Sequence, residues 1–578
     1  MCIQCGYYFK DYVHSEDLSD NLSSSVLGTN QNLANYLTNG FWTDYGTVSR
    51  KFNLNDYGIN PKNNIITYNT SGNSFDENGI NRERNFLVDE AFKLLEATMG
   101  FNFEKTDLQA DINFGDEYAF SAFAFPSGRS YSSGLDYVNI NIGSNWNRKR
   151  SDFGNYTFQT ILHEIGHSLG LGHQGSYNGS GNYSNDSLFI NDSWQSSIMS
   201  YFSQSQNTSI NGSFAYLSTF MSVDWIALNN IYSKDGISTS NAFKGDTTYG
   251  FNTNIISATS AIYSEMSTLI EKTAFTLVDG EGIDTIDFSG FSSNQLIDLR
   301  ETELDSNTLF TSNIGGKIGN LTIANGTIIE NANGGTGKDY IKGNYVNNVI
   351  YGNAGNDTIY GDRGKDTLFG GLGNDQINGE EDNDFINGGK GDDIINAGSG
   401  DDLIIGSQGN NTITFGLGKD TIDYSNFENS ISLIRGGSVD KGIFGTDNFV
   451  DFYNTIFASS NNSDWIDGLS GGGNIASLDI DLKNNSLSVL NLPGIGEFNS
   501  EIYNFENISG SNNSDNLLGD NKDNKIFGND GNDFINGGKG DDIINAGSGD
   551  DLIIGSQGNN TITFGLGKDT IDYSNFEN

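Results

Sequence analysis

The sequence has few basic residues, few prolines and no long apolar run. Lys and Arg number 30 against 74 Asp and Glu, and the formal net charge of −44 argues against nucleic-acid binding, which needs a basic face. No apolar run approaches the roughly 18 residues that span a bilayer, so no membrane span is expected. With 3 prolines, the turns must depend on Gly, Asn and Asp. The N-terminus also lacks the basic start and apolar core of a secretory signal peptide.

What the chain does contain is glycine, acidic residues and aromatics. At 578 residues, several domains are expected, and 74 glycines with 35% hydrophobic residues suit a globular domain joined to a glycine-punctuated repeat array. A disordered acidic protein is the alternative, but 12% aromatic residues and regular apolar spacing speak against it. The acidic excess instead favours bound cations.

Three of the four histidines lie within eleven residues, in the pattern HExxHxxGxxH. His163 and His167 are four apart, so on a helix they share one face and can bind one metal ion. Glu164 is then placed to act as general base on the attacking water. Gly170 lets the backbone leave the helix, so that His173 can become the third ligand. This spacing predicts a zinc protease site.

A second motif lies downstream, where residues 197–201 read S-I-M-S-Y. Extended zinc sites of this type rest on a tight turn that carries a methionine. With this motif the chain resembles the serralysins, which are secreted metzincin zinc endopeptidases. The resemblance implies that Met199 forms the hydrophobic base under the metal. It also implies that Tyr201 is an additional, displaceable zinc ligand that stabilises the transition state.

The resemblance covers most of the chain from about residue 30 and implies an α+β catalytic domain followed by an all-β parallel roll. Within the first domain we expect a strand at 64–69, a helix at 81–98 packed through Phe86 and Leu87, a strand at 110–115 and a closing helix at 224–232. The segment 120–126 matches the family's edge strand, which pairs with the substrate backbone, although an ordinary strand explains it equally well. The predicted edge-strand residues are Phe120, Ser121, Ala122, Phe123, Ala124 and Phe125.

Residues 279–290 resemble the first calcium site of the family. The resemblance implies Asp279, Gly282, Asp284 and Asp287 as candidate ligands. The chain departs from the family at Val278 and Glu281, where Trp and Gly are usual.

From residue 334 to 423 the sequence falls into ten nine-residue units of the form GGxGxDxUx, typical of calcium-binding β-rolls. The glycines allow tight turns, the sixth position offers a carboxylate, and the aliphatic eighth position points inward. Oxygens from successive turns can share one Ca²⁺, which takes 6–8 oxygen ligands. Asn348 and Asn411 replace Asp in two units, where we expect weaker binding. The predicted ligands of this block are Asp339, Asp357, Asp366, Asp375, Asp384, Asp393, Asp402 and Asp420.

A second block of nonapeptides begins at residue 510. Its predicted calcium ligands are Asp515, Asp533, Asp542, Asp551 and Asp569. Residues 383–429 recur unchanged as 532–578, which indicates a recent duplication or an assembly artefact, and we expect the second block to be incomplete. The predicted segments are a leader (1–29), a catalytic domain (30–235), a β-rich junction (236–333), a first roll block (334–429), a β-rich spacer (430–509) and the second roll block (510–578).

In families with such rolls, export uses a one-step type I secretion machinery, and the chain folds outside the cell in millimolar calcium. The resemblance therefore implies a secreted, extracellular protein, and we expect a monomer whose partners are protein or peptide substrates. Cys2 and Cys5 could form half a zinc knuckle, a disulfide or a thiolate that blocks the catalytic zinc. A dispensable leader, with His14 as a solvated residue, is the favoured interpretation.

The predicted function is peptide-bond hydrolysis, with zinc and calcium as cofactors. The alternative is a non-enzymatic, calcium-dependent surface or matrix protein that carries a relic protease domain. The presence of both Glu164 and Tyr201 counts against that alternative, since a relic would be free to lose either.

Overall fold

The structure is a computed structural model that describes residues 26–54, 62–127, 135–149, 152–434, 437–451, 454–460, 463–469, 476–492 and 496–574. Cys2, Cys5 and His14 of the predicted leader lie outside the described residues. The chain divides into two compact units, Met1–Asn333 and Gly334–Asn578. The other boundaries proposed from the sequence stay predictions.

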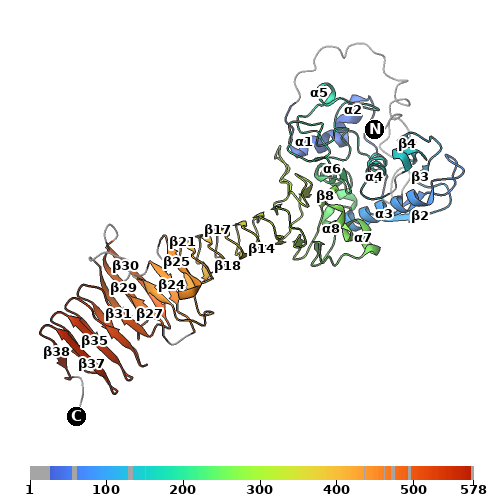
Figure 1. The fold of residues 1–578 in the computed structure, drawn as a ribbon. Coiled ribbons are helices and arrows are strands. Elements are labelled where there is room, and N and C mark those ends of the chain that lie inside the picture. The colour runs from blue at the N-terminus through green and yellow to red at the C-terminus, as the bar shows by residue number, and fades with distance from the viewer. Residues whose placement is uncertain are drawn as a thin grey trace. The chain divides into compact units, whose positions relative to one another are not determined.

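The first unit contains the helices (Figure 1). Its longest helix, α3, is capped at its start by Asn81, whose side chain accepts a hydrogen bond from the Arg84 N–H (3.0 Å). It ends at Gly100, where φ is +77°. The helices and helical turns are α1 (Asn30–Asn35), η2 (Tyr36–Gly40), α2 (Phe41–Asp44), α3 (Arg82–Met99), η3 (Trp146–Lys149), α4 (Tyr156–Ser168), α5 (Tyr183–Asp186), α6 (Ser222–Tyr232), η4 (Ser233–Asp235), η5 (Thr239–Asn241), α7 (Ser257–Ser264) and α8 (Met266–Leu269).

A five-stranded sheet accompanies these helices, in the order β2-β1-β3-β5-β4. The pairs of β1 with β2 and β3, and of β3 with β5, are parallel, whereas β4 is antiparallel to β5 at the edge. The strands predicted at 64–69 and 110–115 and the helix predicted at 81–98 are confirmed to within two residues, but Phe86 is 52% exposed and is not a core residue. The strands are β1 (Ile66–Asn69), β2 (Phe103–Lys105), β3 (Ile112–Gly115), β4 (Ala122–Ser127) and β5 (Tyr137–Ile142).

The rest of the first unit is rich in short parallel strands. One set pairs in the order β11-β8-β6, and another in the order β12-β9-β7. These strands are β6 (Tyr216–Leu217), β7 (Thr248–Gly250), β8 (Thr273–Leu277), β9 (Thr285–Asp287), β10 (Leu296–Asp298), β11 (Leu321–Ile323) and β12 (Asn331–Asn333).

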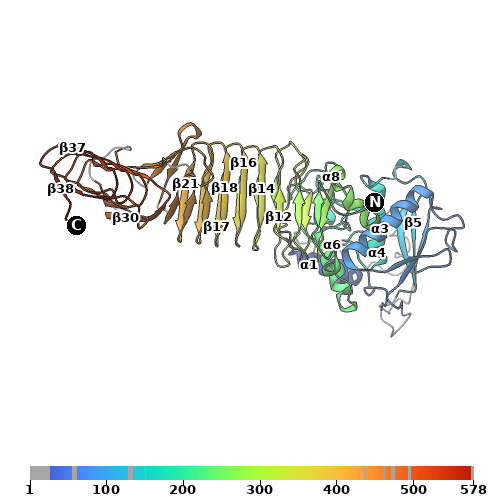
Figure 2. The same cartoon turned by 90° about the horizontal axis from the view of Figure 1, so that it is seen from below.

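The second unit is a parallel β-roll. Strands two apart along the chain pair in register 18 residues apart, so that Ile359 lies beside Ile377 and Leu368 beside Ile386. All four side chains are fully buried, because the eighth position of each nonapeptide faces inward. Figure 2 shows β14, β16 and β18 stacked side by side. The predicted fold class, an α+β unit followed by an all-β roll, is confirmed.

The roll continues through the predicted spacer. Within this unit one sheet runs β13-β15-β17-β19-β21-β25-β24-β23-β27-β31-β33-β35-β37, and the other β14-β16-β18-β20-β22-β26-β30-β29-β28-β32-β34-β36-β38. Antiparallel strands occur only around β24 and β29 among the described pairs of this unit. Strands of the spacer therefore link the two nonapeptide blocks into the same two sheets.

The strand bounds of the first nonapeptide block are β13 (Tyr340–Lys342), β14 (Val349–Ala354), β15 (Thr358–Asp362), β16 (Thr367–Leu372), β17 (Gln376–Glu381), β18 (Phe385–Lys390), β19 (Ile394–Ser399), β20 (Leu403–Ile405), β21 (Thr412–Leu417) and β22 (Thr421–Asp423). Those of the spacer are β23 (Ser432–Ile434), β24 (Ser438–Asp440), the turn η6 (Gly442–Phe444), β25 (Thr446–Phe449), β26 (Thr455–Phe457), β27 (Trp465–Asp467), β28 (Ser477–Asp481), β29 (Ser486–Leu492), β30 (Gly496–Tyr503) and β31 (Asn507–Ser509). The last block has β32 (Asn516–Leu518), β33 (Lys525–Phe527), β34 (Phe534–Asn536), β35 (Ile543–Ser548), β36 (Leu552–Ile554), β37 (Thr561–Leu566) and β38 (Thr570–Asp572).

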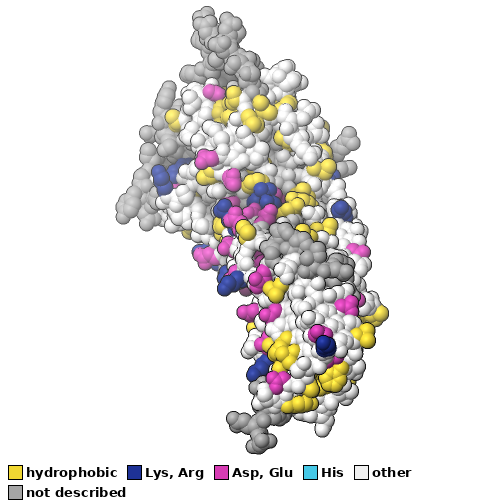
Figure 3. Space-filling model, turned by 90° about the vertical axis from the view of Figure 1, so that its left-hand side faces the viewer, with side chains coloured by type: hydrophobic (Ala, Val, Ile, Leu, Met, Phe, Trp, Pro, Cys, Tyr) yellow, Lys and Arg dark blue, Asp and Glu magenta, His cyan; other side chains and the backbone are white. Residues whose placement is uncertain are grey.

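The surface reflects the composition. Acidic side chains recur over the face seen in Figure 3, with fewer Lys and Arg among them. Among the described residues, no helix is long and apolar enough to cross a membrane.

Candidate metal centres

Helix α4 carries the first two histidines. Asn155 caps its start, because the Asn155 side chain accepts a hydrogen bond from the Thr157 N–H (2.8 Å). His163 and His167 lie one turn apart with ring centroids 4.8 Å from each other. The predicted helical pair is therefore present on one face.

The chain then reverses at Gly170, where φ is +106°. A Cβ at this position would lie 2.3 Å from the backbone oxygen of Arg50, so the turn needs glycine on two grounds. The turn is held from outside: the Trp42 indole N–H donates to the Gly170 carbonyl (3.0 Å) and the Tyr232 hydroxyl to the Leu169 carbonyl (3.0 Å). This reversal brings His173 back to the helix.

The three imidazoles form a group whose ligand atoms all lie within 4.8 Å of one another. In each ring Nδ1 lies 2.8–2.9 Å from a backbone carbonyl, that of Ile198 for His163, Leu171 for His167 and Tyr177 for His173. With Nδ1 as the donor, each Nε2 keeps a lone pair, and those of His167 and His173 are 3.0 Å apart.

Burial also keeps these rings neutral. It lowers the pKa of His167 to about 4, and it lowers the pKa of His163 and His173 well below the usual value, with the neighbouring imidazoles adding to the effect for these two. Neutral imidazoles with fixed orientations are the donor set that suits zinc.

Glu164 lies beside these histidines. Its two carboxylate oxygens are buried and have no hydrogen-bond partner among the described residues. Burial raises its pKa to about 8, and the nearby backbone of Ala124 opposes the shift. Together with His163 and Tyr201 it lines a cavity of about 370 Å³, whose walls include the aromatic side chains of Tyr156, Trp194, Phe214 and Tyr216. A buried carboxylate without a partner, facing a cavity, is suited to proton transfer.

Met199 lies against helix α4. A Cβ on Gly166 would come within 2.7 Å of the Met199 sulfur, so the glycine between the two helical histidines allows this approach. Asp224 of α6 accepts hydrogen bonds from the Ser197 hydroxyl (2.6 Å) and the Ile198 N–H (2.7 Å). Because the Ile198 carbonyl holds His163, Asp224 positions the metal site through the methionine turn. Sequence reasoning missed this residue.

Tyr201 lies against the histidines, with its ring centroid 4.5 Å from that of His173. Its hydroxyl accepts a hydrogen bond from the Gly179 N–H (3.1 Å), and burial raises its pKa. A second network supports it: buried Asp192 accepts from the Ser200 hydroxyl (2.6 Å) and the Tyr177 hydroxyl (3.0 Å). The sequence contained no motif that singled out Asp192.

Strand β4 is the edge of the five-stranded sheet and contacts α4. It begins at Ala122 and contains Ala122, Phe123, Ala124 and Phe125, whereas Phe120 and Ser121 precede it. The predicted strand started too early, because residues 118–120 form a turn in which the Ser121 N–H donates to the Tyr118 carbonyl (3.0 Å). Phe120 is 74% exposed.

The junction site contains two of its predicted aspartates close together. Burial raises the pKa of Asp279 to about 6 and that of Asp284 to about 8, and the charge of Asp279 adds to the second shift. Glu330, which was not predicted, accepts the Asp284 N–H (2.6 Å). The oxygens of Asp287 instead accept from Asn252 (2.8 Å) and the Ser289 N–H (2.9 Å). Two buried like charges need a cation, which the acidic oxygens here could bind.

The roll aspartates lie in rows, 18 residues apart. The N–H of each donates to Oδ1 of the next, for example Asp366 to Asp384 (2.9 Å) and Asp384 to Asp402 (2.8 Å). In these rows a further carboxylate oxygen, Oδ2, is buried and has no hydrogen-bond partner among the described residues. This holds for Asp357, Asp366, Asp375, Asp384, Asp393, Asp402, Asp533, Asp542 and Asp551.

These oxygens face a space that only glycine leaves open. A Cβ on Gly352 would lie 2.6 Å from Asp357 Oδ2 and 2.6 Å from the backbone oxygen of Gly370. We call each nonapeptide strand with its turn a rung, so that neighbouring rungs of one row are 18 residues apart. Carboxylate and carbonyl oxygens from two neighbouring rungs converge here, and these are the ligands that calcium prefers. The residues therefore fit a Ca²⁺ ion between rungs. Burial raises the pKa of Asp357 to about 7 and that of Asp366 to about 8, because an unpaired carboxylate is costly there.

At the row ends the carboxylates have other partners. Asp339 Oδ2 accepts the Gly335 N–H (2.6 Å), and Asp515 accepts from Ser511 and Leu478. Asp420 and Asp569 keep the contact seen within the rows, since Oδ1 of Asp420 accepts the Asp402 N–H (3.1 Å) and that of Asp569 the Asp551 N–H (3.2 Å). The predicted calcium ligands therefore differ in how many oxygens they leave for an ion.

Comparisons with known proteins cover both units. Residues 239–456 match the family described as "Peptidase M10 serralysin C terminal", and residues 131–223 match "Metallo-peptidase family M12B Reprolysin-like". The "RTX calcium-binding nonapeptide repeat" matches residues 509–544 and 537–571.

Curated relatives agree. Metallopeptidase AprA of Pseudomonas marginalis is 41% identical over 237 residues, which cover 40% of this chain and 46% of the relative. The chain is similar to serralysins. Serralysin C of Dickeya chrysanthemi is 38% identical over 39% of this chain and 44% of its own length, and serralysin of Photorhabdus luminescens is 34% identical over 45% and 49%.

The match spans about half the length of these relatives. The serralysin-like chain thus combines metallopeptidase and calcium-repeat sequences, which confirms the predicted resemblance and the predicted pair of cofactors, zinc and calcium. The individual ligands stay predictions.

Proposed function

We propose that this chain is a secreted zinc-dependent endopeptidase whose roll is folded by calcium. The observation that supports it most is the group of three clustered, neutral imidazoles beside Glu164, a buried carboxylate without a hydrogen-bond partner among the described residues. A relic domain has no reason to keep an uncompensated buried carboxylate, which costs stability. The similarity to serralysins points to the same chemistry.

His163, His167 and His173 would hold the zinc ion. Bound zinc would supply a Lewis acid that polarises the scissile carbonyl and the attacking water. Its charge would also lower the pKa of Glu164, so that the side chain is a carboxylate and can accept the proton of the water. Glu164 then delivers that proton to the leaving amine.

Two further elements act on the substrate. The Tyr201 hydroxyl, whose pKa is raised by burial, would donate a hydrogen bond to the oxyanion in the transition state. The exposed edge of β4 offers backbone groups to an extended peptide, which would add as a further strand. The adjoining aromatic cavity would receive a side chain of that peptide.

The calcium ligands proposed in the roll are the row aspartates with a buried oxygen left for an ion, together with Asp279 and Asp284 at the junction. Export by a type I machinery, an extracellular location and a monomeric state follow from the resemblance to serralysins and belong to this proposal. Protein and peptide substrates are the proposed partners.

The test is Glu164→Ala in the full-length protein, with casein as the probe substrate. We expect proteolysis to be abolished while zinc content stays near the wild-type value, because Glu164 is not among the ligands. Glu83→Ala, an exposed position on α3, is the matched control and should retain full activity. Substantial residual proteolysis in Glu164→Ala would overturn the proposal, as would an inactive wild-type protein loaded with zinc and calcium.

A further inference from the structure

The row that contains Asp357, Asp375 and Asp393 continues beyond the nonapeptides. Asn411 takes the next rung, since its Oδ1 accepts the Asp393 N–H (2.9 Å). Strands β21 and β25 then pair with Thr412 beside Asn448, which places Asp447 on the following rung. Asp447 is thus the terminal carboxylate of this row, although it lies in the spacer.

This carboxylate differs from those before it, because both of its oxygens have fixed partners. Oδ1 contacts the Lys441 ammonium and accepts from the Asn411 side chain (2.8 Å), while Oδ2 accepts from the Tyr424 hydroxyl (2.6 Å). Asp393 Oδ2, two rungs earlier, has no partner among the described residues.

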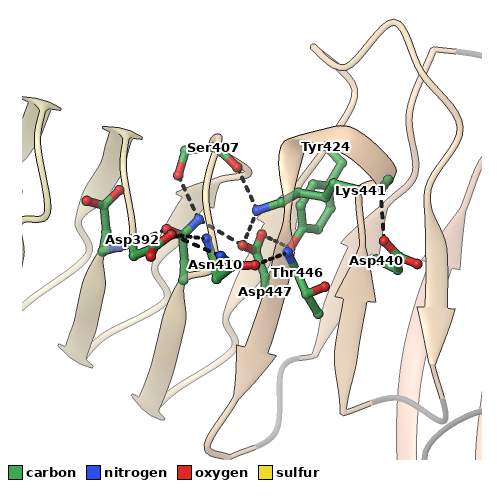
Figure 4. Close-up of polar contacts among 11 residues, drawn as sticks. Asp392, Ser407, Asn410, Tyr424, Asp440, Lys441, Thr446 and Asp447 are labelled. Carbon is green, nitrogen blue, oxygen red and sulfur yellow. Dashed lines mark hydrogen bonds and ion pairs between the residues drawn. The ribbon is translucent and has the colours of Figure 1, made fainter.

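Lys441 brings a full positive charge into the roll. Its side chain and that of Asp447 are both 0% exposed. The ammonium also donates to the Ser407 carbonyl (2.7 Å), so it joins a backbone carbonyl of one rung to the carboxylate of the next (Figure 4). Those are the two kinds of oxygen that converge between rungs elsewhere in the row.

The space around this position is also filled. A Cβ on Gly406 would lie 2.1 Å from the Tyr424 ring, whereas a Cβ on Gly352 would meet a carboxylate and a carbonyl oxygen. An aromatic ring therefore occupies the room that the earlier rungs leave near their acidic oxygens. Burial lowers the pKa of Lys441 and raises that of Asp447, and each charge opposes the shift of the other.

We propose that Lys441 is a built-in cation that takes the place of calcium at this rung, so that the row ends in a closure that needs no metal ion. The closure consists of Ser407, Asn411, Tyr424, Lys441 and Asp447. A lysine held by its own chain has a high effective concentration at this position, unlike a free ion. The rung would thus stay ordered at calcium concentrations at which the preceding rungs open.

Hydrogen-exchange mass spectrometry of the full-length protein, in a calcium series from chelator to millimolar, tests this. In the wild type we expect peptides covering 438–449 to stay protected at calcium concentrations where peptides covering 357–402 have lost protection. In Lys441→Met both regions should lose protection together, because Asp447 then needs calcium. Lys419→Met, an exposed lysine of the same block, is the control and should behave as the wild type.

A second variant separates charge from packing. Lys441→Met combined with Asp447→Asn removes both charges, and we expect it to restore protection of 438–449 at low calcium, even if Lys441→Met alone fails to fold. The proposal would be overturned if Lys441→Met kept wild-type protection, if both regions of the wild type opened at the same calcium concentration, or if the double variant behaved as the single one.

Discussion

The histidine centre and the aspartate rows differ in the charge and the hydrogen-bond partners of their side chains when no metal ion is bound. At the centre the proposed ligands are neutral, and each ring is oriented by a backbone carbonyl, so the arrangement of the three rings does not depend on an ion. In the rows the ligands are carboxylates with a buried oxygen left unpartnered, and the same charge recurs every 18 residues. The first arrangement is preorganised by packing, whereas the second is costly until a cation binds.

This difference indicates what each metal does. Loss of zinc should remove chemistry and leave the first unit folded, since α4 and its turn are held by Trp42, Tyr232 and Asp224. Loss of calcium should remove structure, because each rung buries only a short apolar strand against repelling carboxylates. The proposed role of Lys441 agrees with this comparison. At that position the roll provides a lysine ammonium as the cation, so the carboxylate of Asp447 has a partner without calcium.

After Glu164→Ala, the largest effect is expected from Tyr201→Phe, which sharpens the chemical side of the comparison. Loss of one oxyanion donor should lower kcat by about 100-fold, with KM little changed. Steady-state kinetics on a peptide substrate measure both. Tyr183→Phe is the control, because it removes a hydroxyl from the same aromatic cluster whose hydrogen bond goes to the Ile190 carbonyl. An effect confined to KM would assign Tyr201 to substrate binding instead.

A smaller effect is expected from removing carboxylates in the rows. The triple variant Asp375→Asn, Asp384→Asn and Asp393→Asn should raise the calcium midpoint of folding by about tenfold, because amide oxygens bind calcium more weakly. Circular dichroism during a calcium titration gives the midpoint. Asn already stands at positions 348 and 411, so the change is compatible with the fold.

The matched control for the rows carries the same change in charge on exposed acids, in Asp382→Asn, Asp392→Asn and Asp401→Asn. Its calcium midpoint should move far less than that of the row variant. If both triples shifted the midpoint equally, net charge rather than the row geometry would control the roll.

Asp192→Asn tests whether the histidine centre is held by its surroundings. An amide offers Ser200 and Tyr177 one uncharged acceptor oxygen in place of the two carboxylate oxygens, so both hydrogen bonds weaken. Tyr177 carries the carbonyl that orients His173. We expect zinc affinity to fall by about tenfold, as for other groups that orient metal ligands. Competition with a chromophoric chelator measures it, with Asp186→Asn as an exposed control. An unchanged zinc affinity would show that Asp192 serves only folding.

The calcium-free roll should also respond to pH. The folded-state pKa values of Asp357, Asp384 and Asp393 are raised to about 7 and those of Asp366 and Asp533 to about 8, above their unfolded values. The folded roll therefore binds more protons than the unfolded chain, and its stability should fall as pH rises from about 4, the unfolded pKa of Asp, to about 8. Circular dichroism of the full-length protein in chelator, at about pH 5 and about pH 9, compares the folded fraction of the roll. A calcium-free roll that became more stable with rising pH would contradict it.

The two metal regions were recognisable from the sequence because their ligands are local. HExxHxxGxxH places His163, Glu164, His167 and His173 within three helical turns and a bend, and the nonapeptide repeats its aspartate at a fixed step. Spacing alone therefore predicted which residues come together, and the apolar eighth position predicted which side chains of the roll face inward.

The supporting residues could not be found in this way. Asp224, Asp192 and Glu330 act through partners 8 to 46 residues away, and the sequence has no pattern that links them. Lys441 lies 34 residues from Ser407, and it lies in a spacer without nonapeptides. Only the strand register, which depends on the folded roll, places it beside the row.

The most direct test of the account is hydrogen exchange over the whole chain after calcium is removed by a chelator that leaves zinc bound. We predict that peptides from α4 keep slow exchange and that about one zinc ion per chain is retained, while peptides covering 357–402 lose protection. A roll that stays protected without calcium would contradict the account, and so would loss of protection in α4 at the same calcium concentration.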